Sequence, residues 1–180
     1  MAIDTGIGIG LPKLNNLGTF DENVTTTQQA PLGQTLLQPA DSLENVGERV
    51  WIYVQVTQAS TATPPTEGQV VVRSSFKSYK DVTIGAATDD VSQAVGVAQL
   101  NWPTYADFTP AATELYGWVQ MKGHAFCKGS GIVVGDNNKG IKLAASGVVD
   151  HTAAITERNF GVIVTAAPGG NAFCQINCNG

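Results

Sequence analysis

Short runs of alternating apolar and polar residues dominate the chain from Trp51 onwards. In WIYVQVTQ (51–58) the alternation has a period of two, which is typical of a β-strand. Further runs are QVVVRSSF (69–76), KDVTIGA (80–86), AVGVAQL (94–100), YGWVQMKGHAFCKG (116–129), GIVVG (131–135), KGIKLAA (139–145), FGVIVTA (160–166) and NAFCQINC (171–178). The turn-forming sequences PPTEG, GDNNKG and APGGN separate several of them. This spacing predicts a single all-β domain, either a β-barrel or a β-sandwich.

Residues 1–48 differ from the rest of the chain in pattern, aromatic content and charge. Phe20 is the only aromatic residue before Trp51, and no hydrophobic period is sustained there. The segment carries one basic and six acidic residues, whereas residues 49–180 carry nine of each, so it accounts for the net charge of -5. Such a segment does not build a core by itself. We therefore predict a long extended acidic N-terminal arm over residues 1–48 and a β-body over residues 49–180.

The arm contains two groups of large apolar residues. Four of them recur at every third position, which places them along one edge of an extended chain with three residues per turn. These four are Leu11, Leu14, Leu17 and Phe20. The second group, between two prolines, comprises Leu32, Leu36 and Leu37. Because disordered tails usually avoid regularly spaced leucines, we predict that both groups contact a neighbouring subunit; the alternative is a disordered tail with scattered leucines.

Composition narrows the class of protein. Charged residues make up only 14% of the 180 residues and show no basic excess, so nucleic acid is not an expected partner. No stretch approaches the ~20 apolar residues of a membrane-spanning helix, and the start of the chain lacks the pattern of a signal peptide. We therefore expect a protein made in the cytoplasm, without a membrane partner and with free thiols rather than a disulfide framework.

A metal site or a catalytic thiol would have to use His124, Cys127, Cys174 and Cys178. In a strand, His124 and Cys127 point to opposite faces, and cysteines four residues apart are separated by roughly 13 Å. This separation argues against a shared zinc ion and against a Cys174–Cys178 disulfide. We predict that Cys127 is a core residue and that Trp118, Lys122 and His124 face outward, to solvent or to a neighbouring molecule. A disulfide from Cys127 to Cys174 or Cys178 stays open.

Other catalytic and cofactor patterns are incomplete. His124 and His151 lack the partners of a catalytic triad, and the sequence contains no GxSxG nucleophile motif. The glycine-rich stretches GIGIG and GSGIVVGDNNKG fit turns better than a dinucleotide or phosphate loop. We therefore predict no catalytic residues, no metal and no cofactor.

An aromatic-rich stretch raises a different class of function. Trp102, Tyr105 and Phe108 lie in NWPTYADF, where they would form an exposed aromatic patch that can stack on sugars. The alternative interpretation is that this proline-containing loop covers one end of the β-body.

Eight segments follow one another in a characteristic order. They are PLGQ (31–34), RVWIYVQVTQA (49–59), EGQVVV (67–72), AVGVAQ (94–99), YGWVQMKGHAFC (116–127), GIVVGD (131–136), FGVIVTAA (160–167) and NAFCQI (171–176). This order resembles that of the head decoration, or cement, proteins of tailed bacteriophages. The chain departs from that pattern in the length of its arm through Phe20, and in having Met121 and Ile176 where valine is expected.

The resemblance implies a β-barrel or tulip-like domain on the outer capsid surface of the virion, without catalytic residues. There it would bind the major capsid protein and stabilise contacts between capsid subunits, often as a homotrimer, after being made and assembled in the host cytoplasm. The alternative function is a β-rich glycan-binding or host-adhesion module of the virion.

Overall fold

The computed structural model describes residues 24–40, 47–73, 78–152 and 159–178. Its strands are β1 (Thr35–Gln38), β2 (Arg49–Thr57), β3 (Val70–Val72), β4 (Thr83–Ile84), β5 (Ala94–Val97), β6 (Glu114–Cys127), β7 (Ile141–Leu143), β8 (Val149–His151), β9 (Gly161–Ala167) and β10 (Asn171–Asn177). Single 3-10 turns are η1 (Val91–Gln93), η2 (Tyr105–Asp107), η3 (Val134–Asp136), η4 (Ala145–Gly147) and η5 (Pro168–Gly170). The predicted all-β class is confirmed. Within these residues, no helix has the length and apolar character needed to cross a membrane.

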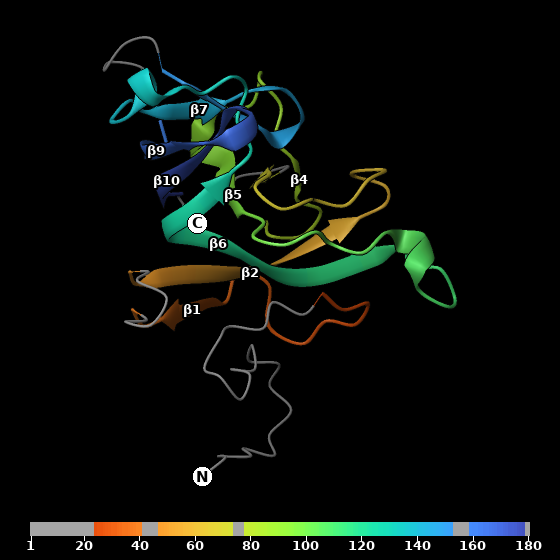
Figure 1. The fold of residues 1–180 in the computed structure, drawn as a ribbon. Coiled ribbons are helices and arrows are strands. Elements are labelled where there is room, and N and C mark those ends of the chain that lie inside the picture. Colours follow the sequence, from red (N-terminus) through yellow and green to blue (C-terminus); the bar gives the residue numbers. More distant parts are fainter. Residues whose placement is uncertain (1–23, 41–46, 74–77, 153–158, 179–180) are drawn as a thin grey trace.

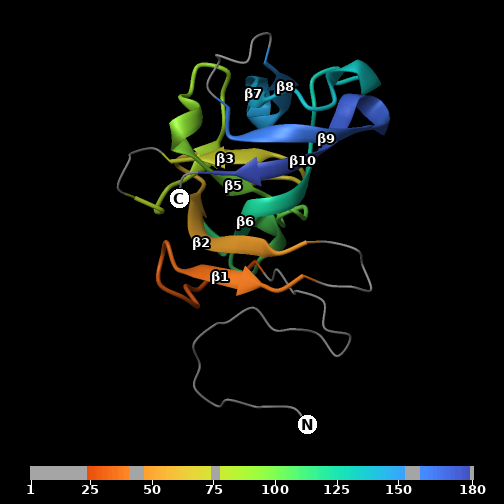
Figure 2. The ribbon, with the colours of Figure 1, turned by 90° about the vertical axis from the view of Figure 1, so that its left-hand side faces the viewer.

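Eight of the strands form one antiparallel sheet, and β7 pairs with β8 in a second sheet. The main path runs β1-β2-β6-β5-β3-β4, while β10 pairs with both β6 and β9. Figure 2 shows β2 and β1 on one side of β6, with β10 and β9 on the other. Among the described strands, β1 and β4 have one partner each, so the sheet does not close into a barrel.

Strand β6 connects the two parts of the sheet. It pairs with β2 from Glu114 to Lys122 and with β10 from Lys122 to Cys127. The strand curves strongly across the molecule (Figure 1). Gly123, near the change of partner, has a φ of +101°, and a Cβ atom there would lie 2.5 Å from the carbonyl oxygen of Glu48. Because glycine alone fits such a position without strain, the sequence permits the bend here.

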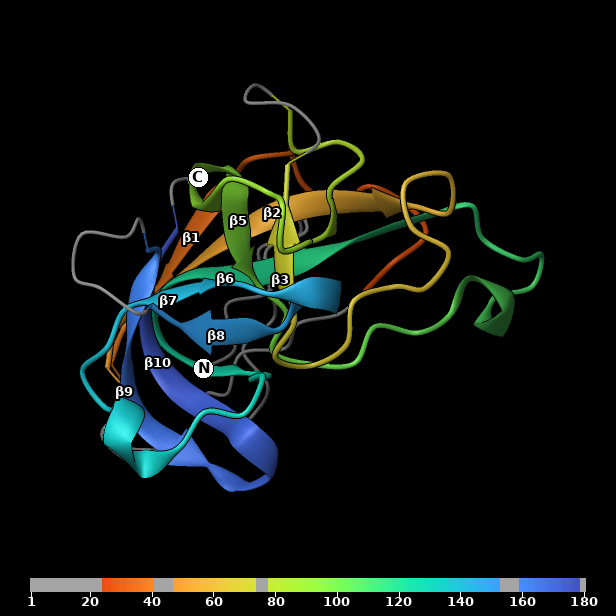
Figure 3. The ribbon, with the colours of Figure 1, turned by 90° about the horizontal axis from the view of Figure 1, so that it is seen from above.

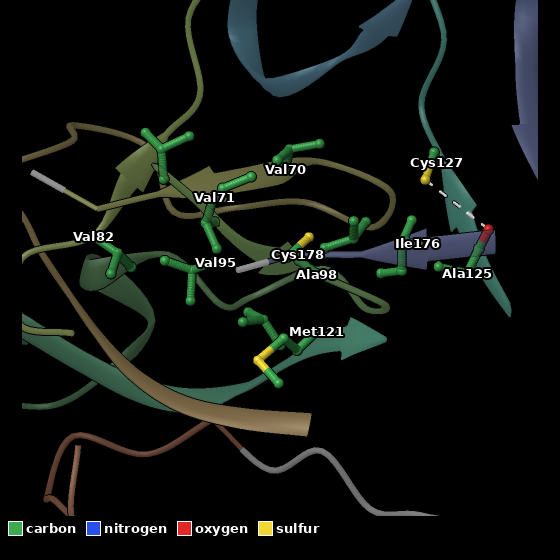
Figure 4. Close-up of a cluster of buried hydrophobic side chains, with 14 of the residues drawn as sticks. Val70, Val71, Val82, Val95, Ala98, Met121, Ala125, Cys127, Ile176 and Cys178 are labelled. Carbon is green, nitrogen blue, oxygen red and sulfur yellow. Dashed lines mark hydrogen bonds between the residues drawn. The ribbon is translucent and has the colours of Figure 1, made fainter. Parts of the chain in front are cut away.

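The main hydrophobic core gathers side chains from β2, β3, β5, β6 and β10 and from the β7–β8 pair. Odd-numbered residues of β6, from Leu115 to Cys127, face it. Figure 4 shows Cys127, Ile176 and Cys178 in this core together with valines of β3 and β5. Burying one such aliphatic side chain contributes about 1.5–3 kcal/mol, so this core stabilises the body.

Strand β1 lies inside the segment that the sequence assigns to an arm. It pairs antiparallel with β2, from Thr35 opposite Ile52 to Gln38 opposite Arg49. Thr35–Gln38 therefore belong to the sheet, and Thr25 forms an isolated bridge with Tyr116. A four-residue strand between prolines carries too little alternation to be recognised from sequence.

The predicted strand at GIVVG (131–135) is wrong, because the chain forms the 3-10 turn η3 there. The Asp136 carboxylate accepts a hydrogen bond from the Val133 N–H at 2.9 Å, which closes the turn. The predicted turn at APGGN is confirmed as η5, which links β9 to β10.

Candidate functional site

The sheet face turned away from the main core consists of a covered part and an uncovered part. Even-numbered residues of β6 point to this outer face along the whole strand. Tyr116 and Trp118 lie on it near the start of β6, and His124 and Phe126 lie on it near the end. Both parts lie on the same side of one strand. What distinguishes them is whether another segment of the chain lies over them.

The first part, which we call the covered face, is a layer of aromatic rings. Its rings are Trp51, Tyr53, Tyr116 and Trp118. The centroid of the Tyr53 ring lies 6.5 Å from that of Tyr116 and 5.1 Å from that of Trp118. The segment over them contributes Ala30, Leu32 and Leu36. All four rings are buried within the chain, so the prediction that Trp118 is available to solvent or to a neighbouring molecule is wrong.

Hydrogen bonds fix this layer and the segment above it. The Gly33 N–H donates to the Tyr53 carbonyl at 2.8 Å, and the Tyr53 N–H donates to the Gln34 carbonyl at 2.9 Å. The indole N–H of Trp51 donates to Oε1 of Gln38 at 2.9 Å. These polar groups therefore find partners within the chain despite their burial.

Tyr116 is the titratable group of the covered face with a shifted pKa. Its phenol donates to Oε2 of Glu114 at 2.6 Å. Burial, followed by this hydrogen bond, raises the pKa of Tyr116 to about 12. The phenol therefore stays protonated at any physiological pH.

The second part, which we call the open face, lies on β6, β10 and β9. It comprises Lys122, His124, Phe126, Val162, Val164, Thr165, Phe173 and Gln175. One cross-strand row joins Phe126, Phe173 and Thr165, and the next joins His124, Gln175 and Val162. A register shift between Phe173 and Cys174 leaves Val164 without a directly opposed residue.

Apolar side chains of the open face are exposed. Phe173 is 45% exposed, and Val162 and Val164 are each 40% exposed. The half-buried ring of Phe126 meets that of Phe173 edge-on, with 5.7 Å between centroids. Apolar residues grouped on one sheet face, with polar residues between them, are typical of a surface that binds another protein.

A turn with two exposed valines borders the open face beside β9 (Figure 3). Val133 and Val134 point to solvent at η3, and the N–H of Ile163 in β9 donates to the Lys139 carbonyl at 2.9 Å. Asp136 stabilises the turn by accepting hydrogen bonds from Val133 and, at 2.8 Å, from Nζ of Lys139. The bond from Lys139 is the main cause that lowers the pKa of Asp136.

The three thiols are buried and free. A hydrogen bond with Cys174, together with burial, raises the pKa of Cys127 well above its ordinary value, and burial raises the pKa of Cys178 to about 12. Cys127 donates to the Ala125 carbonyl across 4.0 Å (Figure 4). Because the thiolate is the nucleophile and metal ligand, the raised pKa values make Cys127 and Cys178 unreactive core residues, and Cys174 is buried in the same core. The prediction for Cys127 is confirmed, and it pairs with neither other cysteine.

Histidines do not come together with the thiols. His124 lies half-buried on the open face, as its alternation predicts. Nδ1 of His151 lies 3.3 Å from Oδ1 of Asp150 and 3.5 Å from Oδ2 of Asp136, so His151 belongs to a charged cluster. The part of the chain that the structure describes contains no group of three or more His, Cys, Asp or Glu residues that could hold a metal ion.

The predicted subunit contacts separate into three sets. Leu11, Leu14, Leu17 and Phe20 lie outside the described residues. Leu32 and Leu36 pack against the covered face of their own chain, so they are part of its fold. Leu37, on the opposite side of β1 from Leu36, is 55% exposed and stays a candidate contact.

The predicted exposed aromatic patch is wrong. Trp102 and Tyr105 are each only 4% exposed and belong to the main core, and the half-buried Phe108 packs against it. The Trp102 ring lies so close to β6 that a Cβ atom on Gly117 would be 2.9 Å from its Cζ2 atom. Burial also raises the pKa of Tyr105 to about 12. The proline-containing loop therefore covers one end of the core.

Sequence analysis did not single out Val162, Val164 and Phe173. The signal was present in FGVIVTA and NAFCQINC, because alternation places Phe173 on the face opposite Cys174. Alternation alone does not show whether another segment covers that face.

No protein-family model matches the chain, and no curated protein matches it. The candidate site therefore rests on sequence pattern and geometry.

Proposed function

We propose that this chain is a structural virion protein that decorates the outside of a tailed-phage head. It binds the major capsid protein as a homo-oligomer, with a trimer favoured, and stabilises contacts between capsid subunits. The order of sequence motifs supports the phage class, because it resembles that of cement proteins. The open face is the observation that carries the proposal, since its exposed Phe173, Val162 and Val164 are suited to an assembly.

The proposed mechanism is thermodynamic linkage. A protein that binds the assembled shell better than its separate subunits shifts the equilibrium toward the shell. Many symmetric copies multiply a modest affinity at each site, and linked copies bind more tightly than single ones. A small β-domain with one apolar face can therefore stabilise a very large particle.

No second function is proposed. The glycan-binding alternative depends on exposed Trp102 and Tyr105, and both side chains are buried in the core. Replacing them would test the stability of the fold rather than sugar binding.

Co-sedimentation with heads that lack the protein tests the proposal. The wild-type protein should sediment with the heads and raise the temperature at which they open. Phe173→Asp should bind at least about tenfold more weakly, a loss of about 1.4 kcal/mol, because a carboxylate replaces an apolar contact. Ala62→Asp is the control, since it adds the same charge in the exposed loop after β2.

Two results would contradict the proposal in different ways. A wild-type protein that does not sediment with heads rules out decoration. Equal sedimentation of Phe173→Asp and wild-type protein removes the open face from the binding surface.

A further inference from the structure

The covered face shows what kind of segment binds the outer side of this sheet. Its cover, residues 30–36, is a tight turn at Leu32 and Gly33 that leads into β1; it places Leu32 and Leu36 on aromatic rings and forms backbone hydrogen bonds with β2. The open face continues the same side of β6 and carries Phe126 and Phe173. Among residues 24–40, 47–73, 78–152 and 159–178, the turn at Gly68 lies against the ring of Phe126, but no segment covers Phe173, which is 45% exposed.

The sequence contains a second segment with the chemistry of the cover. Between residues 11 and 20, large apolar residues recur at every third position, and Asp21 and Glu22 follow directly. Three cross-strand pairs of the open face, Lys122–Asn177, His124–Gln175 and Phe126–Phe173, contain no carboxylate. Glu48 lines a hollow beside Lys122 and His124, so one acidic group borders the face. The exposed Lys122 on the face still complements the acidic end of the segment.

Chain reach keeps the Phe20 end of this segment away from the open face of its own chain. Val24 packs into the main core, and Thr25 forms a bridge with Tyr116 near the start of β6. Phe126 lies ten residues further along β6, roughly 33 Å by contour at about 3.3 Å per residue. Phe20 is four residues from Val24 and reaches at most about 14 Å from it. The curvature of β6 shortens the direct path between its two ends (Figure 1), yet the reach of Phe20 is less than half of the contour between Tyr116 and Phe126.

We propose that residues 11–22 of a second copy of this chain cover the open face. In this arrangement the apolar residues of the segment lie over the open face as Leu32 and Leu36 lie over the covered face. The residues of the segment are Leu11, Leu14, Leu17 and Phe20, and those of the face are Phe126, Phe173, Val162 and Val164. This inference names the partner of the open face and rests on the homo-oligomer of the proposed function. Copies that exchange the segment around a rotation axis form a closed ring, so the free protein is an oligomer.

The molar mass of the full chain in solution, measured without heads, is the first test. The wild-type protein should have a multiple of the 18.8 kDa of one chain. Leu17→Asp and Phe173→Asp should each lower the mass to that of one chain, because each places a carboxylate in the same apolar contact. Ala62→Asp should keep the wild-type mass, and circular dichroism with thermal unfolding should show that all variants are folded. A monomeric wild-type protein, or an oligomer that survives Leu17→Asp, would overturn the inference.

Disulfide trapping distinguishes exchange between copies from contact within one copy. A Leu17→Cys variant and a Val164→Cys variant are mixed so that their subunits exchange, and the mixture is oxidised mildly. The three native thiols are buried, so only the introduced thiols are expected to form a crosslink. A covalent product of two chains is expected. A chain that carries both substitutions serves as the comparison. If the two-chain product does not form and this doubly substituted chain forms an internal crosslink, the contact lies within one chain and the inference is overturned.

Failure of this inference is distinguishable from failure of the proposed function. A monomer that still sediments with heads overturns the exchange and leaves decoration standing. An oligomer that meets both tests above but does not bind heads supports the exchange and overturns decoration.

Discussion

The covered face and the open face are two halves of one sheet surface with opposite relations to solvent. Both arise from even-numbered residues of β6, so the same period-two alternation places Trp118 and Phe126 on one side. Trp118 is buried under residues 30–36, whereas the neighbour of Phe126 across the strands, Phe173, is 45% exposed. The comparison teaches that a remote segment, and not the strand pattern, decides which half is part of the core.

The two halves also differ in how their apolar surface contributes free energy. Full burial of a large apolar side chain contributes about 1.5–3 kcal/mol. The covered face gains this stabilisation within one chain. The open face gains it only when a partner binds, so its apolar residues contribute to assembly rather than to folding.

The largest expected contrast comes from removing one ring in each half. Trp51→Ala should lower the free energy of unfolding by about 3–5 kcal/mol, because Trp51 is fully buried. Phe173→Ala should lower it by only about 1–2 kcal/mol in the monomer, because nearly half of that side chain is exposed. Urea denaturation of both variants measures the difference. Equal losses would mean that the open face is already covered within its own chain.

A glutamine in each half gives the next contrast. Gln38→Met removes the acceptor of the Trp51 indole N–H and so breaks a hydrogen bond between two buried side chains, which should cost about 1–3 kcal/mol. Gln175→Met is the matched control on the open face, where the exposed glutamine should be replaceable at almost no cost. Urea midpoints compare the two. A harmless Gln38→Met would show that the layer over Trp51 admits water.

Alkaline pH should weaken the covered face before it affects the open face, whose residues include no tyrosine. The pKa of Tyr116 is raised from 10.0 to about 12 in the folded chain, so folding favours the protonated phenol. This stabilisation is fully present below pH 10 and is lost as pH rises through about 12. Unfolding free energies measured across this range should fall, and Tyr116→Phe should reduce the slope. Part of the slope should remain in Tyr116→Phe, because the pKa of Tyr105 is shifted in the same direction. An unchanged slope in Tyr116→Phe would contradict the assignment.

The smallest expected effect is at the edge of the sheet. Leu37→Asp on β1 should change the free energy of unfolding by no more than about 0.5 kcal/mol, because the side chain is mostly exposed. It should also leave the mass in solution unchanged. If it reduced head binding as strongly as Phe173→Asp, the free edge of β1 would be a binding surface as well.

Local alternation was sufficient to predict the longer strands, and it failed where tertiary contacts decide the outcome. The runs around Trp51, Cys127 and Cys174 are strands with the predicted core cysteine. By contrast, Trp102 is buried because Gly117 lets its ring approach β6, and this contact joins residues fifteen positions apart. A polar loop sequence carries no sign of that contact.

The same limit explains what was missed at the candidate site. Strand β1 is defined by its pairing with β2 rather than by its own four residues. Val133 and Val134 resemble a strand in sequence, but Asp136 closes a turn around them. Alternation along β10 places Phe173 on the outer face, because its neighbour Cys174 is a core residue. Whether Phe173 is exposed depends on which segments of the chain lie over β10.

A density map of decorated heads shows whether the open face becomes buried in the assembled particle. The predicted result is continuous protein density over Phe173, Val162 and Val164, with residues 11–22 of a neighbouring copy in that density. Decorated heads in which these three side chains face solvent would contradict burial of the open face.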